Sequence, residues 1–446
     1  MKALMIAYEF PPAAAGGVMR TVKFARYLPR FGWTPHVLTP TVSSVRCQDP
    51  SMLDELPAEV RVHRCRSFEY RGGLGGGGPI AEALDWRLRA LLDRFAIPDR
   101  MAYWAVPAVL RGLWVVTRHR IDALYSTSWP FSDHLAGLLL HRFTGLPWVA
   151  DFRDPWLQHY NYGPRGTRHD RWNRRIEAAV CRYASFVSSP TVMATRALRQ
   201  SHPGLPRGRF VTIRNGYDEA DFSDRVPPDD DFLIVHAGSF YGSRNPGGFF
   251  AGVERFLAER PEAAGRLRIV FLGTSLDQNF VPPAVNARLD YIPWVSHAET
   301  LRWLRRARVL LLIQHSDPAV RLTIPGKLYE YMACDRHILA LNTQPCENAS
   351  LLGRYGQATI LDHCEPAAVA SALDGLYTRY TRGELSGAST ADRARAAFVR
   401  GFRRESTART LAGFLERAVA AAQPGADLNA SHGARPAEIG ETSCAC

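Results

Sequence analysis

Short apolar segments alternate with helix-like segments in two successive series, and this repeated alternation restricts the fold more than any other feature. The first series predicts strands at 3–7, 35–39, 60–64, 123–126, 148–151 and 186–188. The second series predicts strands at 232–237, 268–272, 290–292, 309–314 and 337–341. Strands that alternate with helices form parallel sheets covered by helices. Because 446 residues exceed one compact core, we expect two α/β domains.

The predicted domain boundaries follow from composition. We assign residues 1–222 to the first domain, 223–400 to the second, 401–422 to a final helix and 423–446 to a disordered tail rich in small and polar residues. The run Pro-Pro-Asp-Asp-Asp at 227–231 is the predicted linker. We interpret its acids as a solvated hinge, rather than as a carboxylate cluster for a metal, because they directly precede a strand.

Loops that follow strands hold the candidate binding residues, because ligands in open α/β sheets bind beyond the carboxyl ends of the strands. Gly16 and Gly17 follow the first strand and open a helix, so the backbone there can approach a phosphate closely. Arg20 adds charge one turn later. The alternative interpretation is a tight strand-to-helix turn.

A second loop of small residues follows the strand at 232–237. Its Gly238 and Ser239 offer backbone N–H groups to a phosphate, and Arg244 adds a guanidinium near the next helix. A plain surface loop is the alternative.

Lys327 stands in the first turn of a helix that Pro325 and Gly326 begin, where a cation is unfavourable unless an anion binds. The chain has 52 arginines and 3 lysines, so a lysine here indicates that a compact ammonium is needed. Glu330 lies on the same helical face, and its carboxylate can accept hydrogen bonds from both ribose hydroxyls. Leu328 completes this donor-binding set. The alternative is an exposed Lys/Glu pair on an amphipathic helix.

Two acids, Asp151 and Asp154, end or follow another strand and are candidates for contact with a sugar hydroxyl or an acceptor. Arg153 can pair with either acid, so an internal salt bridge that orders the loop is the alternative. Taken together, the loops from both halves predict a diphosphate-bearing ligand held between two domains.

These motifs, in this order, resemble the retaining glycosyltransferases of family 4, and most closely the bacterial members that build exopolysaccharide, capsule or O-antigen. The resemblance runs from Lys2 to about Ala421. Its motifs are Gly16-Gly17, Asp-Phe-Arg-Asp-Pro-Trp at 151–156, Ile-Arg-Asn-Gly-Tyr-Asp at 213–218 and Pro-Gly-Lys-Leu-Tyr-Glu-Tyr-Met-Ala at 325–333.

The resemblance implies a GT-B fold, in which two Rossmann-like domains have parallel sheets that face a central crevice and the last helix crosses back to the N-terminal domain. Residues 1–222 would be the acceptor-side domain and 223–400 the nucleotide-sugar-binding domain. Arg244 and Lys327 match the basic residues that hold the donor diphosphate. Glu330 matches the carboxylate that binds the ribose.

Two positions depart from the family pattern. Leu322 stands where many relatives have a glutamate that contacts the donor sugar, and Ser128 matches a histidine that some relatives place on that sugar. We assign Arg20, Ser128, Asp151 and Asp154 to contacts with the acceptor or the sugar.

The predicted activity is transfer of a sugar from a nucleotide diphosphate to a saccharide or lipid-linked acceptor, in surface polysaccharide or glycoconjugate biosynthesis. Arg244 and Lys327 would stabilise the leaving diphosphate without a metal or a cofactor, and retention is implied by the resemblance. The alternative is a catalytically inactive nucleotide-sugar-binding or scaffold protein of the same fold, which Leu322 and Ser128 would suit.

The first 220 residues carry 30 basic and 18 acidic side chains, whereas the remainder carries 25 of each, so we expect an anionic partner for the first half. Nucleic acid is disfavoured because no recognition motif is present. A dinucleotide oxidoreductase is disfavoured because the GxGxxG spacing is missing.

We expect a cytoplasmic protein, peripheral on the inner face of the membrane. The predicted membrane-facing patch comprises Trp86, Arg87, Arg89, Arg94, Phe95, Arg100 and Trp104; the alternative is an ordinary packed amphipathic helix.

Overall fold

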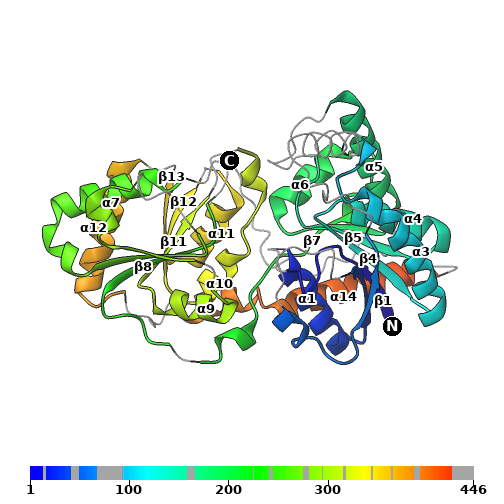
Figure 1. The fold of residues 1–446 in the computed structure, drawn as a ribbon, viewed down its shortest axis with the longest axis horizontal. Helices are drawn as coiled ribbons and strands as arrows, with labels where there is room; N and C mark the ends of the chain where they lie inside the picture. The colour runs from blue at the N-terminus through cyan, green and yellow to red at the C-terminus, as the bar shows by residue number, and fades with distance from the viewer. Residues whose placement is uncertain are drawn as a thin grey trace, which may run out of the picture. The chain divides into compact units, whose positions relative to one another are not determined.

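The computed structural model divides into two compact units (Figure 1). Unit 1 comprises Met1–Arg214 and Arg404–Cys446, and unit 2 comprises Asn215–Arg403. The described residues are 1–423 without 14–16, 42–49, 68–92, 94, 158–165, 225, 241–244, 275–280, 294, 315–317, 343–344, 363–364 and 386–391. Residues 424–446 of the predicted tail therefore lie outside the description.

Unit 1 is built on a parallel seven-stranded sheet in the order β3-β2-β1-β4-β5-β6-β7. Its strands are β1 (Lys2–Ile6), β2 (Thr34–Pro40), β3 (Arg61–Cys65), β4 (Ala123–Ser128), β5 (Trp148–Phe152), β6 (Phe186–Ser189) and β7 (Phe210–Thr212). The strand order reverses between the neighbours β1 and β4. At such a switch point the loops after the two strands diverge and leave room for a ligand.

The helices that cover this sheet include the last one of the chain. They are α1 (Val18–Tyr27), α3 (Ala102–His119), α4 (Ser132–Thr144), α5 (Thr167–Tyr183), α6 (Val192–Ser201) and α14 (Arg404–Ala421). Helix α14, orange in Figure 1, packs beside α1, blue. Its Leu411 and Leu415 are buried in the same apolar cluster as Met5 and Val22. The final helix thus completes the core of the unit that the N-terminus begins.

Unit 2 repeats this architecture with a parallel six-stranded sheet in the order β10-β9-β8-β11-β12-β13. Its strands are β8 (Phe232–Ala237), β9 (Leu267–Leu272), β10 (Leu289–Ile292), β11 (Val309–Ile313), β12 (His337–Asn342) and β13 (Ala358–Asp362). Here the switch point lies between β8 and β11.

The helices of unit 2 are α7 (Gly247–Glu259), α8 (Pro283–Asn286), α9 (His297–Arg306), α10 (Lys327–Ala333), α11 (Glu347–Tyr355), α12 (Pro366–Thr381) and α13 (Asp392–Arg400). Helices α7 and α12 pack closely because Gly252 lets them approach. A Cβ atom on Gly252 would lie 2.4 Å from Cβ of Val369.

The predicted α/β class, with two parallel-sheet domains and a final helix in the first, is confirmed. Strands β7 and β13 were not predicted. β7 has three residues, too few to give a periodic signal, and β13 at the sheet edge has no long apolar run. The units meet in sequence at Arg214/Asn215, so the predicted boundary after residue 222 falls inside unit 2.

The predicted linker at 227–231 is wrong, because these residues belong to unit 2. The carboxylate of Asp229 lies 2.5 Å from the guanidinium of Arg306, and Arg308 Nε donates to the carbonyl of Asp229. These contacts fix the segment to helix α9 and strand β11.

The predicted membrane-facing patch is described in part. Trp86, Arg87, Arg89 and Arg94 lie outside the described residues. Trp104 is fully buried in the core of unit 1, so its assignment to that patch is wrong. The side chain of Phe95 is 53% exposed. The guanidinium of Arg100 forms an ion pair with the carboxylate of Asp93, with Nη2 and Oδ2 2.8 Å apart. Among the described helices, none has the length and apolar character needed to span a bilayer.

We predict that Gly252→Ala lowers the free energy of unfolding by about 1–3 kcal/mol, because the added methyl group overpacks the contact between α7 and α12. Gly375→Ala is the matched control, since a Cβ atom on this exposed glycine of α12 meets nothing within 4 Å. It should be neutral or stabilise the helix by up to about 1 kcal/mol. Urea denaturation of both variants measures this, and equal midpoints would contradict the prediction.

Candidate functional site

In unit 2 the switch point is bridged by Lys327, the first residue of α10. Its Nζ donates to the carbonyl of Ala237, the last residue of β8, at 2.7 Å. The chain from β11 to α10 therefore reaches back to the end of the neighbouring strand β8. The carbonyl accounts for a lysine in the first turn of a helix without a bound anion.

The imidazole of His236 also contacts the ammonium of Lys327. Its Nδ1 lies 2.8 Å from the carbonyl of Leu311, and a carbonyl can only accept, so Nδ1 carries a hydrogen. In the neutral ring Nε2 is then an acceptor, and it lies 3.4 Å from Nζ of Lys327. The imidazole is fully buried and stacks on Phe240. This packing fixes the ring against the ammonium.

Tyr331 holds α10 onto β8 one turn after Lys327. Its hydroxyl accepts from the backbone N–H of Ala237 at 3.0 Å and is fully buried. Both backbone groups of Ala237 are thus taken by side chains of α10. The position of the ammonium relative to the strand end is set by two hydrogen bonds rather than by one flexible side chain.

The predicted residues Gly238 and Ser239 lie beside this ammonium. Gly238 has φ +112°, which a residue with a side chain rarely adopts, and a Cβ there would lie 3.2 Å from Nζ of Lys327. The hydroxyl of Ser239 donates to the carbonyl of Gly273 at the end of β9. Arg244 lies outside the described residues.

Glu330 faces helix α9. Its Oε1 lies 3.0 Å from Nε2 of His297, the first residue of that helix. Leu328, next to Lys327, is fully buried in the apolar core, and its backbone N–H donates to the carbonyl of Pro325 at 3.0 Å. Leu322 is half-buried. The structure brings Lys327, Gly238 and Ser239 together.

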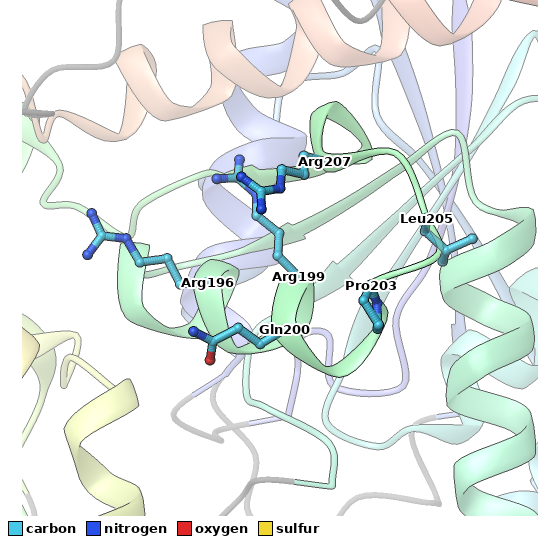
Figure 2. Close-up of a pocket in the computed structure, with 6 residues that line it drawn as sticks. All are labelled: Arg196, Arg199, Gln200, Pro203, Leu205 and Arg207. Carbon is cyan, nitrogen blue, oxygen red and sulfur yellow. The ribbon is translucent and has the colours of Figure 1, made fainter.

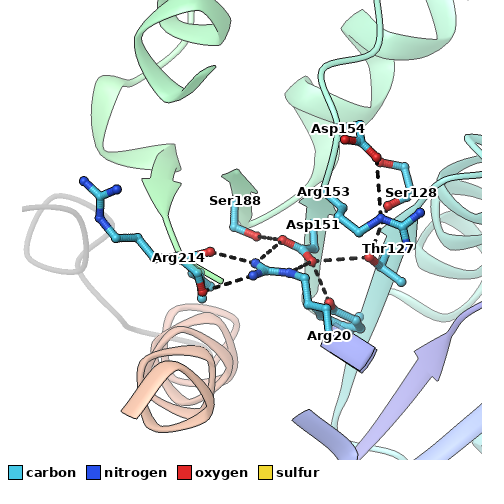
Figure 3. A network of polar contacts seen from close by, with 10 residues as sticks. Arg20, Thr127, Ser128, Asp151, Arg153, Asp154, Ser188 and Arg214 are labelled. Carbon is cyan, nitrogen blue, oxygen red and sulfur yellow. Dashed lines mark hydrogen bonds and ion pairs between the residues drawn. The ribbon is translucent and has the colours of Figure 1, made fainter. Parts of the chain in front are cut away.

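In unit 1 the predicted residues Arg20 and Asp151 bind each other (Figure 3). Nε and Nη2 of Arg20 donate to the two oxygens of Asp151 at 2.7 and 2.9 Å. Tyr125, Ser188 and Thr127 also donate to this carboxylate, at 2.7, 2.7 and 3.3 Å. The internal salt bridge considered for Asp151 is therefore present, with Arg20 instead of Arg153 as its partner.

Arg20 also binds the last two residues of the first segment of unit 1, which ends at Arg214. Nη2 of Arg20 donates to the carbonyl of Ile213 and Nη1 to that of Arg214. Burial alone would raise the pKa of Asp151, but the charge of Arg20 and the hydrogen bonds from Arg20, Ser188 and Tyr125 outweigh it and lower the pKa. The carboxylate stays ionised inside the sheet.

Gly17 is required by Arg153. A Cβ atom on Gly17 would lie 1.5 Å from Nη1 of Arg153, so the guanidinium lies directly on the glycine. This guanidinium also lies 3.0 Å from Glu9 and 3.5 Å from the predicted residue Asp154. Gly16 lies outside the described residues. The space that the missing side chain of Gly17 leaves is therefore filled by the guanidinium of Arg153, and not by a phosphate as the sequence predicted.

The switch point of unit 1 is bridged by Asp133, which accepts from the N–H of Tyr8 at 2.8 Å. Burial, with the neighbouring carboxylates Asp99 and Glu9, holds the pKa of Asp133 well above its usual range despite that hydrogen bond. The predicted residue Ser128 is fully buried, and its hydroxyl has no partner among the described residues.

A separate cavity of about 520 Å³ opens in unit 1 (Figure 2). It is lined by Arg196, Arg199, Gln200, Pro203, Leu205 and Arg207. None of the predicted site residues is in this lining. Its three guanidinium groups make it a candidate for the anionic partner that the basic excess of the first half predicts.

The sequence interpretation missed four residues that shape these sites: His236, Tyr331, His297 and Arg153 in its contact with Gly17. Three of them act through ring or guanidinium contacts with residues far away in sequence, for which spacing gives no signal. Tyr331 does carry a signal, since it lies four residues after Lys327 on the same helical face.

We predict that Asp151→Asn lowers the free energy of unfolding by about 3–5 kcal/mol, because it leaves Arg20 buried without a counter-charge. Asp290→Asn, which removes a half-exposed pair with Arg268, should cost at most about 1 kcal/mol. Because the pKa of Asp151 is lowered in the fold, its contribution is full above the unfolded value of about 3.9 and is lost as the pH falls through the folded value. Denaturation from pH 8 to pH 3 checks this; a gap between wild type and Asp151→Asn that stays constant into acid would contradict it.

Comparison with known proteins finds a family model that matches part of the chain and solved structures that share its fold. Residues 15–216 match the family model of the glycosyl transferase 4-like domain. No curated protein matches the chain. A glycosyltransferase from Rickettsia africae is similar in structure, with a TM-score of 0.60 and 12% identity over 94% of this chain and 98% of its own.

Two further solved structures have the same fold. Alr3699/HepE from Anabaena, in complex with UDP, has a TM-score of 0.61 and 14% identity over 93% of this chain and 100% of its own. A UDP-forming α,α-trehalose-phosphate synthase from Burkholderia vietnamiensis has a TM-score of 0.59 and 13% identity over 93% and 100%. The match to the glycosyl transferase 4-like domain covers residues 15–216, and the chain has the GT-B fold of two Rossmann-like, parallel-sheet domains found in glycosyltransferases.

Proposed function

We propose that this protein transfers a sugar, with retention and without a metal, from a nucleoside diphosphate to a saccharide or lipid-linked acceptor in the synthesis of a surface polysaccharide or glycoconjugate. Unit 2 would bind the donor and unit 1 the acceptor. UDP-sugars are the first donors to test, because Alr3699/HepE was solved with UDP and with UDP-glucose.

The observation that carries this proposal is the ammonium of Lys327 at the switch point of unit 2. It is held by the carbonyl of Ala237 and faced by Nε2 of His236. Gly238 puts no side chain beside it, and a Cβ there would lie 3.2 Å from Nζ, although the N–H of Gly238 itself donates to the carbonyl of Leu272. A fixed cation beside a glycine at the carboxyl edge of a parallel sheet suits a diphosphate.

The chemistry follows from charge. When the bond between the sugar and the diphosphate breaks, negative charge collects on the leaving oxygen. An ammonium whose position is set beforehand stabilises that charge without reorganising during the reaction. We propose that the acceptor hydroxyl attacks from the face that the diphosphate leaves and passes its proton to the departing phosphate. Arg244 would add a second positive charge.

A metal is not needed for this charge balance. Adding EDTA should therefore leave the initial rate unchanged, and NMR of the product anomer tests retention.

Three arginines in one cavity of unit 1 support an anionic partner for that unit. The phosphate of a lipid-linked acceptor or an anionic headgroup would fit there. We propose a cytoplasmic protein, peripheral on the inner face of the membrane.

We predict that Lys327→Ala lowers the rate of sugar transfer about 100- to 1,000-fold, as loss of one preorganised charge at a transition state does. The measurement is release of the nucleoside diphosphate from the donor that best raises the melting temperature in a screen of UDP-, GDP-, ADP- and dTDP-sugars. The matched control is Lys2→Ala, because the Nζ of Lys2 also donates to a backbone carbonyl, that of His119, at 2.8 Å.

The control should keep near-normal turnover. Equal turnover in wild type and Lys327→Ala, with both folded, would defeat the catalytic assignment. Donor binding without any release of nucleoside diphosphate by wild type would favour the inactive binding or scaffold protein instead.

We predict that Glu330→Ala raises the KM for the donor about 10- to 100-fold with a smaller effect on kcat, since a hydrogen bond to a charged group contributes about 1.5–3 kcal/mol. Glu299→Ala on the neighbouring helix is the control, because this carboxylate makes an exposed contact with Arg302. An unchanged KM in Glu330→Ala would remove the ribose assignment.

A further inference from the structure

Three histidines gather at one edge of the sheet of unit 1, and none of them is assigned to the donor or the acceptor. They are His36 in β2, His63 in β3 and His119, the last residue of α3. One ring nitrogen of each lies within 4.8 Å of one ring nitrogen of each of the others. Among the described residues, this is the one group of three potential metal ligands at such distances.

The fold explains how residues so far apart in sequence meet. β2 and β3 are parallel neighbours, and His63 pairs in register with Leu38, two residues after His36. Side chains two residues apart on a strand share a face, so both rings point to the same side of the sheet. Helix α3 packs on β2 and β3 and brings His119 to these rings at its end.

His36 and His63 already face each other through ring nitrogens, at a separation close to that of two ligands of one ion. Nδ1 of His36 lies 3.0 Å from Nε2 of His63, and the ring planes differ by 7°. The ring centroids are 5.2 Å apart, so the rings lie edge to edge rather than one above the other. Two nitrogens bound to one tetrahedral zinc at about 2.0–2.1 Å lie about 3.3 Å apart. To bind one ion the nitrogens would move apart by a few tenths of an ångström, and the rings would turn so that both lone pairs converge on the metal.

The charge state of the rings also suits a metal. Burial, together with the neighbouring His63 and His119, lowers the pKa of His36 to about 4. Burial and His119 lower that of His63 to about 4. A lowered pKa favours the neutral imidazole, which is the form that binds a metal. The cations Lys2, Arg61, Arg111 and Arg118 act on this cluster and would weaken the binding of a dication.

We propose that His36, His63 and His119 form a binding site for a divalent transition metal, of which zinc is the best fit. Neutral imidazoles are ligands for zinc, copper and nickel rather than for magnesium or calcium. Three histidines leave a fourth position for water. The metal would join the end of α3 to the two outer strands β2 and β3, and its role is structural.

The competing description is a packed group of neutral imidazoles in which one ring donates its hydrogen to the next. That arrangement satisfies the same nitrogens without an ion. The two descriptions differ in stoichiometry and in the response of stability to a metal.

The test uses the full chain without a histidine tag, freed of metal with a chelator and then titrated with Zn²⁺ against a chromophoric competitor. We expect one Zn²⁺ per chain and a melting temperature that rises on saturation. Co²⁺ in place of zinc should give the visible d–d absorption of a tetrahedral nitrogen site. His119→Gln, the half-buried ligand, should weaken Zn²⁺ binding at least 10-fold.

The matched control is His141→Gln, a half-buried histidine of the same unit whose Nδ1 contacts the carbonyl of Leu146 outside the cluster. It should bind Zn²⁺ as wild type does. Uptake well below one equivalent by folded wild type, or equal affinity in His119→Gln and wild type, would overturn the proposal. Because the site is structural, EDTA should lower the melting temperature of the zinc-bound protein while sugar transfer, measured below that temperature, keeps its rate.

Discussion

The buried carboxylate of Asp151 is the constraint on which the first unit depends. It accepts hydrogen bonds from Arg20 on α1, from Tyr125 on β4 and from Ser188 on β6. An ionised carboxylate inside a sheet is costly unless such donors surround it. Since Arg20 also binds the carbonyls of Ile213 and Arg214, a single ion pair fixes the first helix, three strands and the exit of the chain.

In unit 2, as in unit 1, an ionisable side chain bridges the switch point of the sheet, but we assign it another role. Lys327 spans the switch point as Asp133 does in unit 1, and its ammonium stands beside Gly238, which has no side chain. The oxygens of Asp151 are occupied by donors of the protein. We therefore assign Asp151 to the stability of the fold, and we propose that Lys327 binds a ligand. This contrast separates the two ion centres more clearly than their residue types do.

Sequence patterns were sufficient for most of the architecture and for part of the site. Apolar patterning located every strand of four or more residues except β13, and it missed β7, which has three residues, one of them buried. The motif at 325–333 predicted Lys327 as a donor-binding residue because its members are adjacent in sequence, and that role stays a prediction. The sequence could not predict that Arg20 pairs with Asp151 or that Arg153 covers Gly17. These residues are 131 and 136 positions apart, and motif spacing carries no information on such distant contacts. The linker was misplaced because prolines and acids at 227–231 look solvated, while Arg306, far along the chain, neutralises Asp229.

The discontinuous course of unit 1 has a consequence for biosynthesis. Domains generally fold in the order in which the ribosome releases them. Here the apolar core around β1 and α1 stays incomplete until Leu411, Phe414 and Leu415 of α14 have been made. Unit 2 is continuous from Asn215 to Arg403, so its whole sequence leaves the ribosome before helix α14 does. The nascent chain must therefore carry a half-covered N-terminal core through the synthesis of an entire second domain, a period in which chaperones have exposed apolar surface to recognise.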